Sequence, residues 1–490
     1  MSSGTTSSRR AFLKSTALAS VAGAAGSASA MAELASANPV PAQRPNVLMI
    51  CADQFRADFI GAMRHNPSTR TVNLDAMARR GVLCTSAICN QPLCSPSRAS
   101  FLTSRYATET RVWKLGPELD HSLPTIANVF DDNGYSTHFV GKWHVSSTGK
   151  DTMGPNTLAW VPPGPSRGGF QTWEGANVTE LTSHPYYGSY WDNEGNDLKF
   201  HDQYRVDFMA SRAIRIIEQP HQKPWFLFLS QLEPHQQNDV DQFVAPNGYA
   251  ETFLNSFVPH DLRNLHGNWQ DHLPGYYGCV QAIDESVGRI VQALDKTGQL
   301  DNTVIAFFSD HGNHFRTRIG EYKRSPHDAS LRVPFILQGP GFDRAVELPQ
   351  QVQLLDLAPT LLDAAGIKPP ASMRGRSILP LLNDADARTK WDDVAYIQIS
   401  ASMCARALRT PEWCYCVYDP DTGGNQAPTS TQYTEWALYS ISGDPAQQHN
   451  LIGRPEYRQV AAGLREVLKQ KIAAAGEPSA NIKPVTIFNS

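Results

Sequence analysis

The sequence predicts an α/β protein with a mostly parallel central sheet that helices cover on both faces. Short, continuous apolar runs recur along the chain, and amphipathic stretches with helical periodicity separate them. Strands that are buried on both faces of a parallel sheet have this continuous apolar character. The runs also end in polar residues, and open α/β sheets bind ligands beyond the carboxyl ends of their strands.

The expected elements can be placed in chain order. Amphipathic periodicity predicts helices at 206–218, 282–297 and 352–365. Apart from the strand at 136–144, the segment 113–204 is rich in Trp, Tyr, Gly and Pro, which predicts long loops over the sheet edge. The apolar runs predict strands at 45–54, 136–144, 224–235, 302–312 and 332–341.

A change of character near residue 385 predicts a second, smaller unit. The runs 405–419 and 435–442 are typical of antiparallel strands, and 455–474 is typical of a closing helix. The expected domains are therefore a leader at 1–30, a large N-terminal domain at 44–385 and a C-terminal subdomain at 386–490.

The leader has the features of an export signal. Arg9 and Arg10 precede an apolar, Ala-rich stretch that ends in Ala28-Ser29-Ala30, an A-x-A cleavage pattern. Such paired arginines are typical of a twin-arginine signal, which predicts the twin-arginine export machinery as a partner and a periplasmic or secreted location. The alternative, an uncleaved membrane anchor, is disfavoured because the apolar stretch is short and weakly hydrophobic. Later segments do not approach a membrane span either, so stable membrane insertion is not expected.

The composition excludes other classes of protein. The formal net charge is −4 over 490 residues, which gives no basic face for nucleic acid. The 8 cysteines are too sparse for a disulfide scaffold in a chain of this length.

Polar residues at two predicted strand ends are candidate metal ligands. Asp53 and Gln54 follow one apolar run, and Asp310 and His311 follow another. Two carboxylates, an amide oxygen and an imidazole suit a divalent cation. An Asp-His-Gly sequence also makes an ordinary turn, so His311 by itself is a weak signal.

A lysine and histidines end the other runs. Lys142 and His144 are two positions apart on a strand and so share a face, where a cation and an imidazole suit an anion and a proton transfer. The alternative for His144 is a satisfied histidine beside Trp143. His235 ends the run at 224–235.

Cys94 has unusual surroundings for a packing residue, because prolines, serines and Arg98 flank it where a helix begins. It could be a core residue, a partner of Cys89 in a disulfide, a nucleophile or the precursor of a modified residue. Free N–H groups at a helix N-terminus favour negative charge and lower the pKa of a thiol. The nucleophile interpretation is therefore physically sound.

Several ordered motifs make the chain resemble the type I sulfatases of the alkaline-phosphatase-like superfamily. Cys-Ser-Pro-Ser-Arg at 94–98, continued by 99–105, resembles their C-x-P-x-R signature, with Ser104 in place of the usual glycine. The resemblance extends from Arg44 to the C-terminal strands and implies an alkaline-phosphatase-like sandwich with a smaller antiparallel subdomain. Further matching segments are 45–54 (first strand), 141–144 (lysine–histidine element), 232–235 (later histidine), 309–312 (second metal pair), 323–334 (lysine segment) and 438–451 (closing motif).

The resemblance implies a modified residue. The signature cysteine of these enzymes is oxidised to formylglycine (3-oxoalanine) by a formylglycine-generating enzyme, which makes Cys94 a precursor and that enzyme a partner. The hydrated aldehyde attacks sulfur with one hydroxyl. The second hydroxyl, deprotonated by His144, lets the sulfated residue collapse and release sulfate.

The resemblance also implies the other roles. Arg98, Lys142 and Lys323 stabilise the charge in transfer, and His235 with Lys323 protonates the leaving oxygen. The implied metal ligands are Asp53, Gln54, Cys94, Asp310 and His311. The more common pattern has Asp-Asp and Asp-Asn where this chain has Asp53-Gln54 and Asp310-His311. Calcium is the favoured ion, with manganese and magnesium as alternatives.

The expected export from the cytoplasm and the loops rich in aromatic residues suggest a sulfated carbohydrate as the substrate, such as an algal polysaccharide. Removing Cys94 leaves an odd number of cysteines, with Cys84–Cys89 as the nearest candidate disulfide. One alternative function is a phosphonate monoester or phosphodiester hydrolase of the same superfamily, and another is a catalytically silent secreted glycan-binding protein. The candidate substrate-binding residues are Trp113, Trp143, His314, Arg316 and His327.

Overall fold

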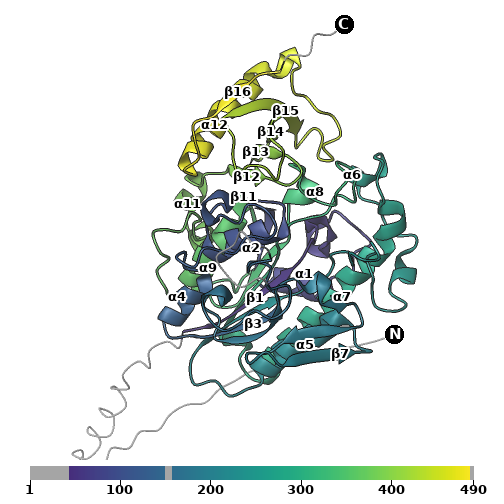
Figure 1. Cartoon of the computed structure of the whole chain (residues 1–490), viewed down its shortest axis with the longest axis vertical. Coiled ribbons are helices and arrows are strands. Elements are labelled where there is room, and N and C mark those ends of the chain that lie inside the picture. Colours follow the sequence, from purple (N-terminus) through teal and green to yellow (C-terminus); the bar gives the residue numbers. More distant parts are fainter. Residues whose placement is uncertain (1–43, 149–156, 486–490) are drawn as a thin grey trace, which may run out of the picture. The chain divides into compact units, whose positions relative to one another are not determined.

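The computed structural model describes residues 44–148 and 157–485, so the predicted leader at 1–30 lies outside the described residues. Within these ranges the chain forms an 11-stranded sheet and a 5-stranded sheet with helices around them (Figure 1). The predicted class, an α/β fold with a large, mostly parallel sheet and a second antiparallel sheet, is confirmed.

The larger sheet contains the parallel strands that lead to the site. Its strands are β1 (Asn46–Ala52), β2 (Val82–Ile88), β3 (Ser136–Lys142), β4 (Thr172–Ala176), β5 (Ser183–His184), β6 (Tyr187–Trp191), β7 (Asp197–His201), β8 (Trp225–Ser230), β9 (Thr303–Ser309), β10 (Phe335–Gln338) and β11 (Val346–Gln353). The order is β11-β2-β10-β9-β1-β8-β3-β4-β6-β5, with β7 paired to β6. The central strand β1 is parallel to β8 and β9, and β3 is parallel to β8 and β4.

Helices cover both faces of this sheet. Leu48 and Ile50 of β1 pack into one hydrophobic core with residues of α1, α5 and α7, whereas Val47 and Met49 pack into a second core with α2, α4 and α9. This alternation is the period of two expected for a strand buried on both sides. The helices are α1 (Val72–Arg80), α2 (Cys94–Thr103), α3 (Ala107–Thr110), α4 (Ile126–Asp132), α5 (Arg205–Ile217), α6 (His260–Arg263), α7 (Trp269–Lys296), α8 (Asp328–Leu331), α9 (Leu357–Ala364), α10 (Leu379–Asn383), α11 (Ala385–Thr389) and α12 (Arg458–Ala474).

Two of the predicted helices differ from the structure. The helix expected at 352–365 is only α9, because the preceding residues up to Gln353 belong to β11, which pairs with β2. The helix expected at 282–297 extends further back, since α7 begins at Trp269 and includes Pro274. Proline is normally a helix breaker, which hid the first part of this helix from a reading of the sequence.

The segment 113–204 is not only loop, as its composition suggested. Besides β3 it contains α4 and the short strands β4 to β7. β4 lies parallel to β3 and extends the sheet, and β6 pairs with β7. These strands are short, and pairing with neighbours rather than an apolar run determines them.

The second sheet is built from the C-terminal part of the chain. Its strands are β12 (Ala395–Ile399), β13 (Cys404–Arg409), β14 (Trp413–Asp419), β15 (Gln432–Ser440) and β16 (Asn481–Lys483). The first four pair antiparallel, and β16 adds a short parallel edge. The side chain of Asn90 connects the sheets by donating to Gln353 Oε1 at 2.7 Å and to the Tyr396 carbonyl at 2.9 Å.

The predicted disulfide is absent. The structure describes all 8 cysteines, and each is a buried free thiol. Because the chain from Cys84 to Ile88 is extended in β2, the Cα atoms of Cys84 and Cys89 are about 15 Å apart, whereas a disulfide needs less than about 7 Å. Neither Cys84–Cys89 nor the alternative Cys89–Cys94 bridge forms.

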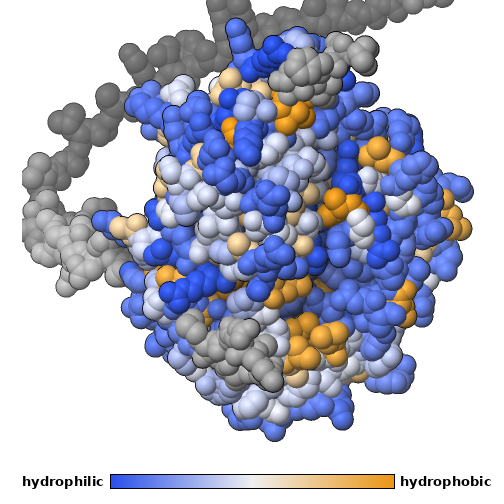
Figure 2. Space-filling model, turned by 45° about the horizontal axis from the view of Figure 1, so that its top comes forward, coloured by the Kyte–Doolittle hydropathy of each residue, from blue (hydrophilic) through white to orange (hydrophobic). Residues whose placement is uncertain are grey.

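On the face drawn in Figure 2, hydrophilic side chains cover most of the surface and hydrophobic groups are scattered between them. Across 44–148 and 157–485, no helix combines the length and the apolar character needed to cross a membrane.

Candidate active site

The carboxyl ends of four strands meet at one edge of the larger sheet. β1, β3, β8 and β9 are parallel neighbours, so the residues that follow them share this edge. Asp53 follows β1, His235 follows β8 and Asp310 follows β9, while Lys142 is the last residue of β3. The sheet thereby gathers side chains that are far apart in the sequence.

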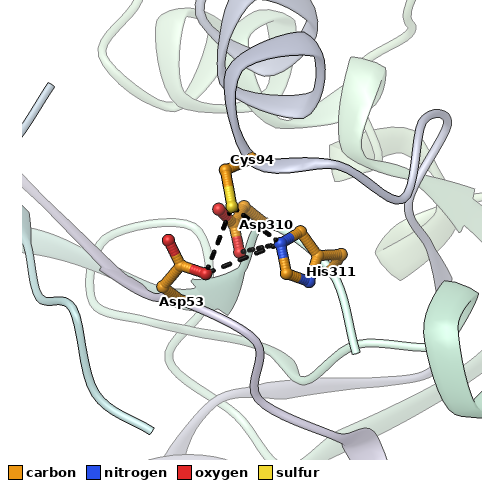
Figure 3. A group of neighbouring side chains, drawn as sticks. All are labelled: Asp53, Cys94, Asp310 and His311. Carbon is orange, nitrogen blue, oxygen red and sulfur yellow. Dashed lines mark hydrogen bonds and ion pairs between the residues drawn. The ribbon is translucent and has the colours of Figure 1, made fainter. Parts of the chain in front are cut away.

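Asp53, Cys94, Asp310 and His311 form one buried cluster (Figure 3). One candidate ligand atom from each lies within 4.8 Å of the others. Nε2 of His311 is 3.2 Å from Sγ of Cys94 and 3.5 Å from Oδ1 of Asp53. The same nitrogen is 3.6 Å from Oδ1 of Asp310. These are four of the five metal ligands that the sequence suggested.

The two carboxylates of this cluster have opposite pKa shifts. Burial raises the pKa of Asp310, and the adjacent charge of Asp53 raises it further. Burial also opposes ionisation of Asp53, but the ammonium of Lys142 and neighbouring cations outweigh this and lower the pKa of Asp53. The cluster therefore places a carboxylate with a lowered pKa next to one with a raised pKa, and positive charge between the two would favour ionisation of both.

The hydrogen bonds of His311 show that a divalent cation fits. Its Nδ1 lies 3.0 Å from the carbonyl oxygen of Gly312, which can only accept, so Nδ1 carries the proton. In the neutral ring Nε2 then presents a lone pair to Asp53, Asp310 and Cys94. Lone pairs that converge in this way repel one another unless a cation lies between them, and a carbonyl on the second nitrogen is a common support of a histidine ligand.

Cys94 is the first residue of α2 and is 2 % exposed. Ser97 in the first turn of this helix donates to the carbonyl of Asp310 at 2.6 Å, which fixes the helix start against the end of β9. The sulfur marks where the oxygens of a modified side chain would lie. Nζ of Lys323 is 3.0 Å from it.

The charge around Cys94 favours an anion. Burial alone would raise the pKa of the Cys94 thiol, but Lys142, Lys323 and His311 lower it well below its usual value, and His144 adds to this. The expected nucleophile position is therefore strongly electropositive.

Arg98 holds this framework together. It is fully buried, with NH2 at 3.1 Å from Oδ2 of Asp53 and Nε at 3.2 Å from Oδ2 of Asp310. Its NH1 donates to the carbonyl of Lys142 at 3.0 Å and to Oγ of Ser230 at 2.7 Å. Arg98 thus contacts both carboxylates of the cluster and the ends of β3 and β8.

Lys142 lies at the end of β3, where that strand approaches β8 closely. Gly141 has φ +110°, and a Cβ on it would lie 2.0 Å from the carbonyl oxygen of Ser230, so only glycine fits there. Nζ of Lys142 is 2.7 Å from Oδ2 of Asp53 and 2.5 Å from Oε1 of Glu180. A lysine ammonium has three N–H donors, so one remains for a substrate oxygen.

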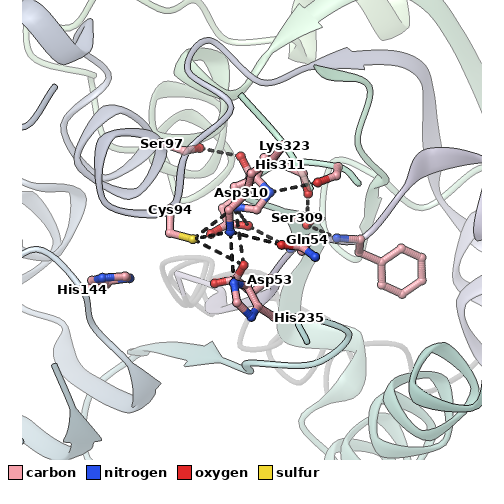
Figure 4. Close-up of polar contacts among 12 residues, drawn as sticks. Asp53, Gln54, Cys94, Ser97, His144, His235, Ser309, Asp310, His311 and Lys323 are labelled. Carbon is pink, nitrogen blue, oxygen red and sulfur yellow. Dashed lines mark hydrogen bonds and ion pairs between the residues drawn. The ribbon is translucent and has the colours of Figure 1, made fainter. Parts of the chain in front are cut away.

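His235 and Lys323 form a pair on another side of Cys94 from His144 (Figure 4). Nζ of Lys323 is 3.1 Å from Nε2 of His235 and 3.1 Å from Oε1 of Gln54. Nδ1 of His235 faces the carbonyl of Gln236 at 2.6 Å, so Nε2 is the nitrogen free to exchange a proton. The amide group of Gln54 donates in turn to Oε1 of Gln236 at 2.8 Å.

Three of the candidate substrate-binding residues are buried outside this cluster. Trp143 packs among aromatic side chains and donates to the Ser166 carbonyl. His314 is buried against the carbonyl of Lys323, and burial lowers its pKa to about 3. Burial lowers the pKa of His327 as well, whose ring lies between Ser325 and Tyr439.

Of the other two candidates, Arg316 is exposed and Trp113 is half-buried. The carbonyl of Trp113 accepts from Ser400, and Nζ of Lys114 lies 4.9 Å over its ring. Arg316 is paired with Asp241 at 3.0 Å and stacks on Tyr322, the neighbour of Lys323, at 4.5 Å. Arg316 is therefore the candidate that stacks on the sequence neighbour of Lys323 and keeps its charged group at the surface.

Sequence reasoning missed Glu180, Gln236 and Asn177. Glu180 contacts Lys142, Gln236 contacts Gln54, and the carbonyl of Asn177 accepts from the backbone N–H of His144 at 2.8 Å. The two residues on the 177–180 loop lie in a segment without an apolar run or a motif. Gln236 directly follows His235, and that adjacency was the available signal.

Comparisons with known proteins identify relatives of this chain. A family model described as Sulfatase matches residues 45–367, and one described as N-sulphoglucosamine sulphohydrolase, C-terminal, matches residues 320–474. The chain is 27 % identical over 451 residues to an ulvan-active sulfatase of Formosa agariphila, covering 89 % of this chain and 82 % of that protein. It is 26 % identical over 483 residues to arylsulfatase K of Rattus norvegicus, covering 88 % and 78 %.

A crystal structure of a sulfatase from Bacteroides fragilis has the same fold. It superposes with a TM-score of 0.75 at 24 % identity and covers 89 % of this chain and 97 % of its own. The alkaline-phosphatase-like fold expected from the motifs is thereby confirmed.

Proposed function

Since the chain belongs to the sulfatase family and is a sulfuric ester hydrolase, we propose that it removes sulfate from carbohydrates through a formylglycine made from Cys94. The observation that carries this proposal is the position of Cys94. It is the first residue of α2, within a C-x-P-x-R sequence, and its sulfur faces both Lys323 and the Asp53–Asp310–His311 cluster.

Two groups supply chemistry that the standard side chains lack. The hydrated aldehyde at position 94 supplies a hydroxyl nucleophile, and a divalent cation held by Asp53, Gln54, Asp310, His311 and residue 94 supplies concentrated positive charge. Calcium is the ion we propose, with manganese and magnesium as the alternatives that the imidazole donor allows.

The cationic side chains would bind and neutralise the sulfate group. The ammonium of Lys323 contacts the sulfur of Cys94, and the charge of Lys142 acts on the same thiol, so both would bind nonbridging oxygens of a sulfate placed there. Arg98 donates to Asp53 and forms an ion pair with Asp310, so we propose that it acts by holding these carboxylates.

Two histidines would move the protons. Lys323 donates to Nε2 of His235, and this pair protonates the leaving oxygen of the sugar. His144 lies away from that pair in Figure 4, and it removes the proton whose loss regenerates residue 94 and releases sulfate. Separate sites for the two proton transfers suit a reaction that has two steps.

The substrate class rests on relatives. The relative from Formosa agariphila is named for its activity on ulvan. This supports a sulfated algal polysaccharide, or its oligosaccharides, as the substrate of the present chain. A location outside the cytoplasm, reached through the twin-arginine machinery after modification by a formylglycine-generating enzyme, agrees with a polymeric substrate. The leader that supports this location lies at 1–30, outside the described residues.

A second candidate function is hydrolysis of phosphonate monoesters or phosphodiesters. The observation in its favour is the metal set, because Gln54 and His311 replace acidic or amide residues of the more common sulfatase pattern. A silent glycan-binding protein is disfavoured, since Lys142, His235 and Lys323 are all in place.

The test uses protein matured with a formylglycine-generating enzyme, with conversion at position 94 measured by mass spectrometry. We expect sulfate release from sulfated algal oligosaccharides and a slower reaction on a matched phosphonate ester. Cys94→Ser should fold normally and lose multiple turnover, because a serine has a single hydroxyl. Cys89→Ser, a buried thiol bonded to the carbonyl of Gln91, is the matched control and should remain active. Turnover by Cys94→Ser, or faster phosphonate hydrolysis, would contradict the proposal.

A further inference from the structure

The site contains a third carboxylate to which the proposed function gives no role. Glu180 lies in a short turn after β4 and is 7 % exposed. Its Oε1 is 2.5 Å from Nζ of Lys142 and 3.8 Å from Nδ1 of His144. Burial opposes its ionisation, but Lys142 and His144 lower its pKa to about 2, so the side chain is negative at neutral pH.

A negative charge at this position works against substrate binding. The ammonium that Glu180 contacts is one of the two that would hold the anionic sulfate group, and a carboxylate beside it reduces that attraction. Burying a carboxylate is also unfavourable in itself. Substrate affinity therefore gives no reason for a glutamate here, and its contacts must serve another purpose.

The contacts of His144 indicate that purpose. Its Nδ1 is the nitrogen nearest Glu180 and has no hydrogen-bond partner within 44–148 and 157–485 other than this ion-pair contact. His144 is one of the groups that lower the pKa of the Cys94 thiol, and since Nδ1 faces Glu180, Nε2 is the nitrogen left to face residue 94. A carboxylate on one imidazole nitrogen fixes the tautomer and the ring orientation at the other.

The backbone of His144 is held by the same loop. Its φ is +63°, in the left-handed region that non-glycine residues rarely adopt, and its N–H donates to the carbonyl of Asn177 at 2.8 Å. Asn177 in turn bonds to the backbone of Ser146 through both its Oδ1 and its Nδ2. The 177–180 loop thus contacts both the backbone and the ring of His144.

We propose that Glu180 is a positioning residue, whose carboxylate directs Nε2 of His144 at residue 94 and holds the ammonium of Lys142 with one N–H turned to the sulfate. This inference rests on the proposed function, because it concerns the proton transfer that releases sulfate. The inference assigns Glu180 to the second step of the reaction, the release of sulfate. It also implies that the negative charge of Glu180 weakens binding of the substrate's sulfate group before the reaction.

The test compares Glu180→Gln and Glu180→Asp with the wild type, each checked for formylglycine content and for cooperative thermal unfolding. The matched control is Glu435→Gln, a buried glutamate in β15 that pairs with Arg465 at 2.8 Å in the second sheet. Three quantities are measured: kcat on a sulfated oligosaccharide, the inhibition constant of inorganic sulfate, and the amount of sulfated residue 94 by mass spectrometry of rapidly quenched enzyme.

For Glu180→Gln we expect kcat to fall about 10- to 100-fold, as for other residues that orient a histidine. Inorganic sulfate should inhibit at about tenfold lower concentration, because a buried negative charge beside its site is gone. Sulfated residue 94 should accumulate. Glu180→Asp retains the charge, so its sulfate inhibition should be unchanged, while its shorter side chain lowers kcat. Glu435→Gln should resemble the wild type in all three quantities.

Opposite results would overturn the inference. If kcat is unchanged in Glu180→Gln, the carboxylate does not position His144. If kcat and sulfate binding are both lost and no sulfated enzyme accumulates, Glu180 has a merely structural role. If Glu180→Gln does not fold, Glu180→Asp decides, and a wild-type kcat there would overturn the inference. Failure of the proposed function is distinguishable, because then the wild type itself, with formylglycine present, would release no sulfate.

Discussion

Nζ of Lys323 lies 3.1 Å from Nε2 of His235, and the same nitrogen lies 3.0 Å from Sγ of Cys94. The ammonium of Lys323 therefore contacts both the nucleophile position and the imidazole proposed to protonate the leaving oxygen. The pair would give a proton to the leaving oxygen, and Lys323 would also stabilise negative charge at the nucleophile position.

This relationship predicts a dependence on the leaving group. His235→Ala should lower kcat on a carbohydrate sulfate by about 100- to 10,000-fold, because a sugar alkoxide is a poor leaving group without a proton. The same variant should lose much less activity on 4-nitrophenyl sulfate, whose phenolate leaves unprotonated. The measurement is kcat on both substrates. His221→Ala, a histidine packed against Trp225 away from the site, is the control. Equal losses on the two substrates would exclude His235 as the acid.

The metal cluster predicts a second outcome. Asp310→Asn should reduce bound divalent metal, because it removes a ligand charge while the Asp310 backbone carbonyl still accepts from Ser97 and retains the helix position. Metal content by elemental analysis is expected to fall together with activity. A chelator should inactivate the wild type, and calcium should restore it. Full metal content in Asp310→Asn would mean that this carboxylate is not a ligand.

Much of this arrangement was accessible from the sequence, for a physical reason. Asp53 and Asp310 directly follow apolar strands, Lys142 ends one, and the ends of parallel strands share one edge of a sheet. Order along the chain is then sufficient to place them together. The same applies to α5, whose apolar periodicity is uninterrupted.

The parts that could not be predicted depend on tertiary contacts. Glu180 lies after β4, a strand of Thr172–Ala176 that is defined by pairing with β3 rather than by its own apolar residues. Trp143, a candidate for substrate binding, points instead into a core of Phe139, Phe170 and Trp173. Packing against neighbouring elements decides the face to which a side chain points at a strand end, and this packing cannot be derived from the sequence alone.

The buried His314 predicts a pH dependence of stability. Burial lowers its pKa from 6.5 to about 3 in the folded protein, so the unfolded chain binds its proton first as the pH falls. Stability from the neutral ring is complete above pH 6.5 and is lost progressively at lower pH. Between pH 6.5 and about pH 5 the free energy of unfolding should fall by about 2 kcal/mol more in the wild type than in His314→Gln. Parallel curves from urea unfolding at these pH values would contradict this.

The position of His144, on another side of Cys94 from His235, predicts a trapped form of the enzyme. His144→Ala leaves Lys142, Lys323 and His235 in place, so sulfate transfer to residue 94 should still occur, whereas its release should slow by about 100- to 10,000-fold. A single burst of free sugar, equal to the enzyme concentration, should precede a slow steady rate. Mass spectrometry of the peptide that contains residue 94 should then show one added sulfate group in His144→Ala and not in the wild type. His272→Ala, a buried histidine among Phe243 and Tyr322, provides the control for loss of an imidazole. A low rate without a burst, or an unmodified peptide during turnover, would assign His144 to the first step instead.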